Sequence, residues 1–169
     1  LHPRARSALF PARMLSGVWF GGLGRDSLGA GVGRLIEEIG RIVDPGTVGS
    51  VDDRRAVRVG TERDLTRLPT SDLVIWVDAD GLIRGTNYRA AEEALRLGAR
   101  LAGIVGERGR LLLQTSDPGH HAVVALRRAD PVGFFDIEIE ARRPFGYPPV
   151  GELMVVEARD LDDMELRNS

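Results

Sequence analysis

The chain has 169 residues, of which 43% are hydrophobic, enough for one domain with a buried core or for one domain and part of another. The formal net charge is −2 at pH 7, so contact with nucleic acid has to come from a local group of arginines. The sequence contains neither cysteine nor lysine, which excludes disulfides, cysteine-ligated zinc and the lysine that grips phosphates in a P-loop.

Residues 1–20 have no regular pattern and are interpreted as an ill-defined N-terminal segment. Two apolar clusters in it, residues 8–10 and 18–20, are each interpreted as a strand or a docking segment. Prolines and arginines interrupt both clusters, which excludes a clean signal peptide or a transmembrane span. We therefore expect a cytoplasmic protein without a membrane partner.

The residue pattern from 29 to 61 predicts a loop, a helix and a strand. Residues 29–33 are Gly-Ala-Gly-Val-Gly, which we interpret as a flexible entry loop. A phosphate site at the following helix N-terminus is less favoured, because the spacing is not GxGxxG and no convincing strand precedes it. Apolar residues at a helical period predict a helix over 35–43, and residues 56–59 predict a strand that ends in Gly60-Thr61.

From here strands and helices alternate. Residues 73–77 are a continuous apolar run, which fits a strand covered on both faces. The remaining patterns predict helices at 89–105 and 132–143, and strands at 110–114 and 153–157.

This alternation predicts an α/β fold, with a mostly parallel sheet flanked by helices and followed by a partial α+β segment. The character of the sequence changes near residue 119. We therefore expect an α/β domain at 21–118 and the beginning of a further domain at 119–169.

Polar residues follow two of the predicted strands. Gly60-Thr61 lies where parallel sheets bind ligands, although a simple strand-to-helix turn explains it equally well. Asp78 and Asp80 end the buried strand and are candidates for a magnesium site or a general base. A cap of the following turn is favoured for Asp78, because no phosphate-binding loop supplies a substrate.

Arginine is the best candidate for binding phosphate, because its guanidinium is a bidentate donor. The candidates are Arg108, Arg110, Arg142 and Arg143. The ordinary alternative for each of them is a solvated surface position. No metal site is expected, because the adjacent His120 and His121 diverge on a helix.

Several short segments occur in a specific order and spacing. They are Val59-Gly60-Thr61-Glu62, Val77-Asp78-Ala79-Asp80, Tyr88-Arg89-Ala90-Ala91-Glu92, residues 112–120 and residues 142–149. Together they resemble the PriA family of replication-restart DNA helicases, over about residues 31–158. The resemblance implies a RecA-like second helicase lobe, followed by the start of the family's C-terminal domain.

In that family the Gly-Thr strand end belongs to helicase motif V, and the arginines of motif VI reach an ATP phosphate held by the first lobe. The C-terminal domain helps to bind DNA forks and single-strand-binding protein. The implied partners are therefore forked or single-stranded DNA, single-strand-binding protein and other primosome proteins. No cofactor is expected in this chain, and ATP with magnesium is expected only if a first lobe is supplied.

The motif VI stretch departs from the family pattern. Its remaining candidates are Gly103, Gly106, Arg108 and Arg110. Ile104 and Glu107 stand where the family has arginines, and the absence of such arginines lowers phosphoryl-transfer rates by about 10³–10⁵. The zinc cysteines and the Lys-Gly-His stretch after Thr61 are also missing, as in PriA-like proteins of high-GC bacteria with eroded helicase motifs. The chain is therefore not expected to be catalytic alone.

The leading hypothesis is a PriA-like protein fragment that binds forked or single-stranded DNA and supports primosome assembly, with eroded ATPase motifs. The alternative is a working ATP-dependent helicase lobe that requires a missing first lobe. A second alternative, from another class, is a nucleotide-binding α/β enzyme that uses the glycines of residues 29–33.

Overall fold

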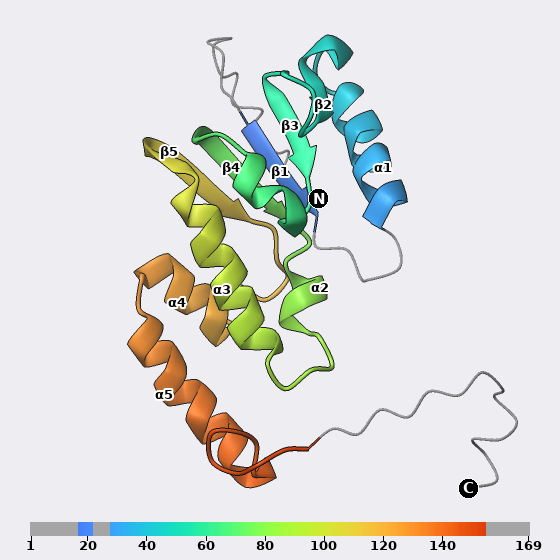
Figure 1. Ribbon diagram of the computed structural model, residues 1–169. Helices are drawn as coiled ribbons and strands as arrows, with labels where there is room; N and C mark the ends of the chain where they lie inside the picture. Colours follow the sequence, from blue (N-terminus) through green and yellow to red (C-terminus); the bar gives the residue numbers. More distant parts are fainter. Residues whose placement is uncertain (1–16, 22–27, 155–169) are drawn as a thin grey trace, which may run out of the picture. The chain divides into compact units, whose positions relative to one another are not determined.

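A computed structural model describes residues 17–21 and 28–154, with only the backbone described for 17–21 and 28–30. The chain divides into two compact units, residues 1–131 and 132–169. The first unit contains the sheet and most of the helices (Figure 1).

The sheet of the first unit is parallel throughout its described pairs and has the strand order β2-β3-β1-β4-β5. Its strands are β1 (Gly17–Gly21), β2 (Val48–Ser50), β3 (Val57–Gly60), β4 (Ser71–Val77) and β5 (Val105–Leu113). The helices of this unit are α1 (Leu28–Gly40), η1 (Pro45–Thr47), η2 (Glu62–Arg67), α2 (Asp80–Ile83), α3 (Ala90–Gly103) and α4 (His121–Arg128). The predicted α/β class is confirmed, and the arrangement is consistent with a RecA-like α/β fragment.

The apolar cluster at residues 18–20 lies in β1, the middle strand of the sheet. The predicted loop at residues 29–33 is wrong, because these glycines lie inside α1. Each glycine weakens a helix by roughly 0.5–1 kcal/mol. Tertiary packing offsets this, since α1 places Ile39 in a buried cluster with Val48 and Val59. The partly buried residues packed against that cluster are Val32, Leu35, Ile36 and Val57.

Helix α3 crosses α4 at close range. A Cβ added to Gly98 would lie 2.3 Å from Cδ1 of Leu126, so a larger residue at position 98 would have to displace the Leu126 side chain. Helix α4 therefore packs within the first unit. The predicted domain boundary at residue 119 precedes α4, whereas the division between the compact units lies after Pro131.

The second unit contains α5 (Pro131–Arg142, whose first residue belongs to the first unit) and η3 (Arg143–Phe145). Helix α5 matches the predicted helix at 132–143. Leu153 and Met154 are not in a strand, and the rest of the strand predicted at 153–157 lies outside the described residues. Among the described residues, no helix is long and apolar enough to cross a membrane.

Candidate functional site

The carboxyl ends of the strands gather several predicted site residues at one edge of the sheet. Gly60 and Thr61 stand at the end of β3, and Asp78 and Asp80 directly follow β4. Because the strands are parallel, these ends lie along the same edge, which is where open α/β sheets bind ligands. The structure thus places the four residues that the sequence indicated for a nucleotide along one edge, with β1 between the two strands that they follow.

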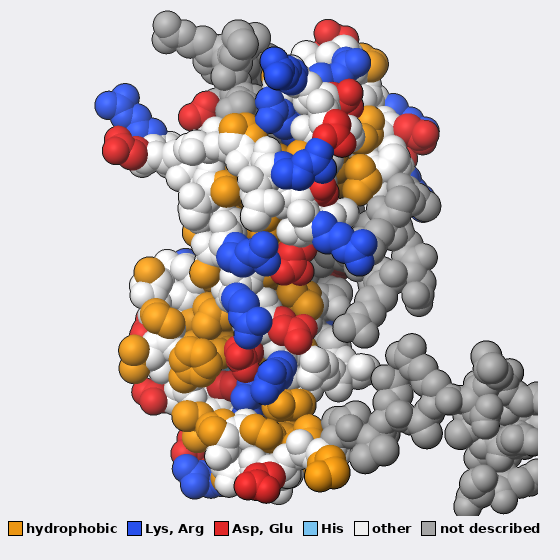
Figure 2. Space-filling view, viewed as in Figure 1, with side chains coloured by type: hydrophobic (Ala, Val, Ile, Leu, Met, Phe, Trp, Pro, Cys, Tyr) orange, Lys and Arg blue, Asp and Glu red, His pale blue; other side chains and the backbone are white. Residues whose placement is uncertain are grey.

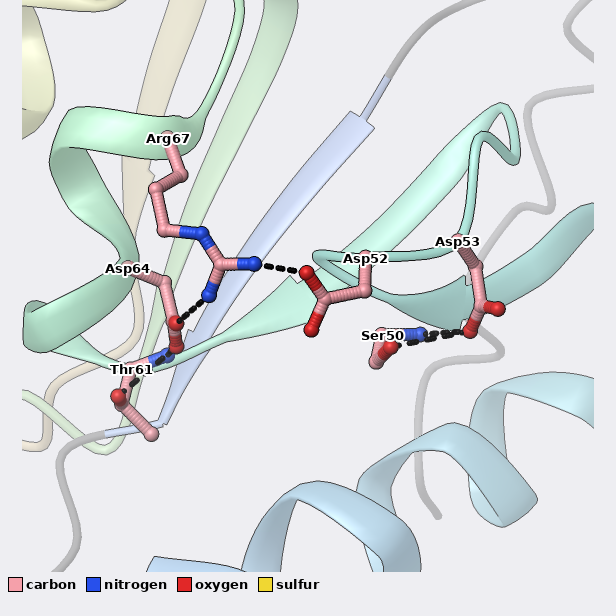
Figure 3. A network of polar contacts seen from close by, with 6 residues as sticks. All are labelled: Ser50, Asp52, Asp53, Thr61, Asp64 and Arg67. Carbon is pink, nitrogen blue, oxygen red and sulfur yellow. Dashed lines mark hydrogen bonds and ion pairs between the residues drawn. The ribbon is translucent and has the colours of Figure 1, made fainter.

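The loop after β3 is closed by its own hydrogen bonds (Figure 3). The Thr61 N–H and Oγ1 both donate to Asp64 Oδ2, at 2.9 and 3.0 Å. The Asp64 N–H donates in turn to the Thr61 carbonyl at 2.9 Å, so η2 begins with a reciprocal cap. Arg67 then bridges the carboxylates of Asp64 and Asp52. The Thr61 amide is therefore already used within the chain.

The glycine before this loop is covered by the connection between β2 and β3. That connection has six residues, 51–56, whereas parallel strands are usually joined by about a dozen or more. This short connection fits because Gly60 and Gly49 have no Cβ. A Cβ added to Gly60 would lie 2.5 Å from Cγ2 of Val51, and one added to Gly49 would lie 2.5 Å from Oδ2 of Asp53. Both glycines therefore make room for the chain itself.

Asp53 is fixed in the same connection (Figure 3). Its Oδ2 accepts the Ser50 N–H at 2.7 Å and the Ser50 hydroxyl at 3.0 Å. The Ser50 backbone bond, followed by the side-chain bond, holds the pKa of Asp53 below its usual value. The carboxylate thus stabilises the turn that follows β2.

Asp80 joins the start of α2 to the segment that follows β5. Its carboxylate accepts the Ser116 hydroxyl at 2.5 Å, the Ser116 N–H at 2.9 Å and the Thr115 hydroxyl. Hydrogen bonds from the Ser116 side chain, the Thr115 side chain and the Ser116 backbone lower the pKa of Asp80 to about 2. Arg84 donates to the Ser116 hydroxyl at 3.0 Å. Much of the acceptor capacity of Asp80 is therefore used inside the fold.

Asp78 is exposed at this edge. Its backbone has a φ of 52°, in the left-handed region that aspartate tolerates better than most residues. The Asp78 N–H donates to Gln114 Oε1 at 3.3 Å, and the Ala79 N–H donates to the Gln114 carbonyl at 3.0 Å. The described residues contain no group of three or more metal-ligating side chains, so this edge has no assembled metal site there.

The remnant of motif VI lies at the opposite edge of the sheet. Gly103 ends α3, and β5 pairs with β4 at Val105↔Ser71 and again at Arg110↔Leu73. Between these two pairs, β5 has four residues, 106–109, and β4 has only one, Asp72. The strand β5 therefore bulges at this point. Gly109 is required there, since an added Cβ would lie 2.9 Å from the Asp72 carbonyl oxygen.

Arg108 and Arg110 are exposed on this side of the sheet. Strand β4 has seven residues, so its ends are about 20 Å apart at about 3.3 Å per residue. The candidate nucleotide residues stand at one end of β4, and Arg108 stands near the other. The two predicted groups therefore do not form one site.

Arg142 in the second unit is buried, with 7% of its surface exposed. Its Nε and Nη2 donate to Glu138 Oε1 at 3.0 and 2.8 Å, and its Nη1 donates to the Pro148 carbonyl at 2.9 Å. Its guanidinium is thus not offered to a phosphate at the surface. Arg143 is exposed and pairs with Glu140 at 2.9 Å. This hydrogen bond raises the pKa of Arg143 and lowers that of Glu140.

Sequence reasoning missed several residues that organise the strand ends. Asp64 has a local signal, since Thr61 and Asp64 have the spacing of a capping box. Thr115 and Ser116 appear in the sequence analysis only as part of the family segment at residues 112–120, with no role assigned to them. Their hydrogen bonds to Asp80 each join residues about 35 positions apart in the chain. A pattern confined to neighbouring residues does not show such a contact.

Comparison with known proteins finds the replication restart protein PriA of several bacteria. This chain is 29% identical to that of Synechocystis sp. over 100 residues, which are 57% of this chain and 12% of the relative. It is 28% identical to that of Thermotoga maritima over 139 residues, 79% of this chain and 18% of the relative. For Treponema pallidum the identity is 33% over 89 residues, 51% of this chain and 14% of the relative.

The predicted resemblance is therefore confirmed: the chain is PriA-like over the matched part. It spans less than a fifth of the length of these relatives. No family model matches the chain.

Proposed function

We propose that the chain is part of a PriA-like replication restart protein of the cytoplasm, that it binds DNA and supports primosome assembly, and that its ATPase motifs are eroded. The observation that carries this proposal is the similarity to PriA from several bacteria, over 51–79% of the chain. Forked or single-stranded DNA is the nucleic acid proposed, and single-strand-binding protein is the proposed protein partner. Both follow from the resemblance.

The loss of ATP hydrolysis is supported by the chemistry of both edges of the sheet. At the carboxyl edge, Thr61 and Asp80 make their hydrogen bonds within the chain. At the amino edge, Glu107 adds a negative charge beside Arg108, where a transferring phosphoryl group needs positive charge. No lysine is present to hold the β- or γ-phosphate.

The proposed DNA contact is local. Arginine and carboxylate side chains lie side by side on the face shown in Figure 2, and many arginines are engaged in ion pairs. Arg108 and Arg110 are exposed and have no ion-pair partner among the described residues. They are the best phosphate contacts of the four candidate arginines, with Arg143 third because Glu140 competes for it.

Fluorescence anisotropy with labelled forked and single-stranded DNA, measured across a salt series, tests this proposal. We expect the double variant Arg108→Ala/Arg110→Ala to bind more weakly, and each arginine that touches a phosphate should lower the salt slope by about one when it is replaced. Arg96→Ala is the matched control, because Arg96 is exposed but already paired with Glu92. Absence of binding at low salt, or equal weakening in the control, would refute the DNA contact.

Hydrolysis is tested separately in a longer protein that includes a first helicase lobe. We expect this protein to bind DNA without turning over ATP. ATP turnover that disappears in Arg108→Ala would instead favour a working helicase lobe.

A further inference from the structure

The turn that follows α5 in the second unit carries an exposed aromatic pair; it lies at the red end of the ribbon in Figure 1. Phe145 is the last residue of η3, and Tyr147 follows it after one glycine. The two ring centroids are 5.7 Å apart and the ring planes are inclined by 25°, so the rings are stacked. Phe145 is 71% exposed, whereas Tyr147 is half-buried. Tyr147 therefore supports one side of Phe145, and most of the Phe145 ring is open to solvent.

Backbone hydrogen bonds fix the turn that carries this pair. The Tyr147 N–H donates to the Arg142 carbonyl at 3.2 Å, and the Tyr147 carbonyl accepts the N–H groups of Val150 and Gly151 at 3.0 and 3.3 Å. Gly146 lies between the two aromatic residues and has a φ of 62°, which glycine adopts readily. A Cβ added to Gly151 would lie 2.3 Å from the Gly146 carbonyl oxygen. The backbone of the turn therefore closes on itself beneath Tyr147.

The buried Arg142 adds a second constraint. Its Nη1 donates to the Pro148 carbonyl at 2.9 Å, while its Nε and Nη2 are held by Glu138. It thereby ties α5 to the residue that directly follows Tyr147. A surface that is already ordered before binding loses little conformational entropy when a ligand settles on it. The aromatic pair is therefore prepared for a flat ligand.

A positive charge lies beside the pair. Arg143 is the first residue of η3, two positions before Phe145, and it is exposed. Its ion pair with Glu140 is exposed as well, and such pairs are weak in water. A phosphate can replace the Glu140 carboxylate and keep a charge-assisted contact with the guanidinium. The turn thus presents a flat apolar ring next to a cation, which is the combination that sites for single-stranded nucleic acid use.

We infer that Phe145, stacked on Tyr147, binds an unpaired base of single-stranded DNA, with Arg143 on the neighbouring phosphate. This inference rests on the proposed function and adds a contact in the second unit to those of Arg108 and Arg110. The bases of a duplex are stacked inside the helix, so their faces cannot reach the Phe145 ring. The platform therefore favours single strands over duplex DNA.

Fluorescence anisotropy with the full chain tests this inference on a labelled single strand and on its duplex. We expect Phe145→Leu to weaken single-strand binding about tenfold, because it keeps an apolar side chain but removes the flat ring. Duplex binding and the salt slope should not change, since stacking releases no counterions. Phe145→Tyr keeps the ring and should bind like the parent.

Phe135→Leu is the matched control. It is the same substitution at another exposed phenylalanine of the second unit, whose ring meets the buried Phe134 edge-on. This variant should bind the single strand like the parent. A fluorescent adenine analogue in the single strand gives a direct readout, because stacking on an aromatic ring quenches its emission. The parent and Phe145→Tyr should quench it, and Phe145→Leu should not.

The outcomes separate this inference from the proposed function. Unchanged single-strand binding in Phe145→Leu, together with weaker binding in Arg108→Ala/Arg110→Ala, would overturn the platform and leave the proposed DNA binding intact. Absence of all DNA binding by the parent would overturn both. Equal weakening in Phe145→Leu, Phe145→Tyr and Phe135→Leu would reject stacking as the cause. A dimer that dissociates in Phe145→Leu while DNA binding is unchanged would assign the pair to an interface between two copies of the chain.

Discussion

At the scale of single residues, the bonds of Asp80 predict an acid-sensitive contribution to stability. Its pKa is lowered to about 2, so its folded-state pKa lies below the unfolded value of 3.8. The contribution is therefore present above about pH 4 and is lost as the pH falls towards 2. We expect Asp80→Asn to be less stable than the parent at neutral pH, with a difference that shrinks between pH 4 and pH 2 in urea denaturation.

Asp78→Asn is the control for this experiment, because it removes an equal charge two residues away and keeps the bonds to Thr115 and Ser116. A difference between Asp80→Asn and the parent that is independent of pH would contradict the assignment of these bonds to the ionised carboxylate.

We expect replacement of glycine by alanine to have opposite effects on the free energy of unfolding at two positions, Gly109 and Gly33. A Cβ at Gly109 would approach the backbone carbonyl oxygens of Ser71 and Asp72 to 3.0 and 2.9 Å, so Gly109→Ala is expected to destabilise the chain by roughly 1–3 kcal/mol. A Cβ at Gly33 meets nothing within 4 Å, and alanine in an exposed helix is favoured over glycine by roughly 1 kcal/mol. Urea titration of both variants measures the difference, and a stabilised Gly109→Ala would refute the pairing of β5 with β4.

At the scale of elements, α4 ends on an unfavourable residue. Ala129 has a φ of 52° and a ψ of 41°, a left-handed conformation that costs an L-residue roughly 1–2 kcal/mol. Ala129→Gly is therefore expected to raise the free energy of unfolding by about 1 kcal/mol. Ala125→Gly, the same change at a buried position inside α4, should lower it by a similar amount or more. Effects of the same sign would show that α4 does not end there.

At the scale of the whole molecule, the two units differ in how their arginines are used. Exposed arginines of the first unit such as Arg96 and Arg100 pair with carboxylates at the surface, while Arg142 is buried on Glu138 in the second unit. Removing one partner of a buried pair leaves an uncompensated charge and costs about 3–5 kcal/mol. We expect Arg142→Met to increase hydrogen exchange strongly in peptides from residues 132–154.

Arg143→Met is the control, because it breaks a solvent-exposed pair with Glu140 and should change exchange little. Both tryptophans, Trp19 and Trp76, belong to the first unit, so their fluorescence checks that this unit stays folded. Equal exchange in the two variants would contradict a structural role for Arg142.

The sequence by itself determined the local elements and the kinship of the chain. The helical pattern of residues 89–105 and the continuous apolar run of residues 73–77 correctly indicated α3 and β4, and the helix predicted at 132–143 corresponds to α5. The family segments were found in the same way, as ordered local strings. The absence of lysine and cysteine was also established without a structure, since composition alone excludes the chemistry that these residues carry.

The tertiary structure decided what depends on long-range pairing. Strand order put β1 at the centre of the sheet, and packing on the sheet drew residues 29–33 into a helix. Parallel pairing separated Arg108 from Asp80 by the length of a strand. Burial distinguished Arg142 from its neighbour Arg143. Each outcome depends on residues far apart in the chain, so the spacing of neighbouring residues does not contain it.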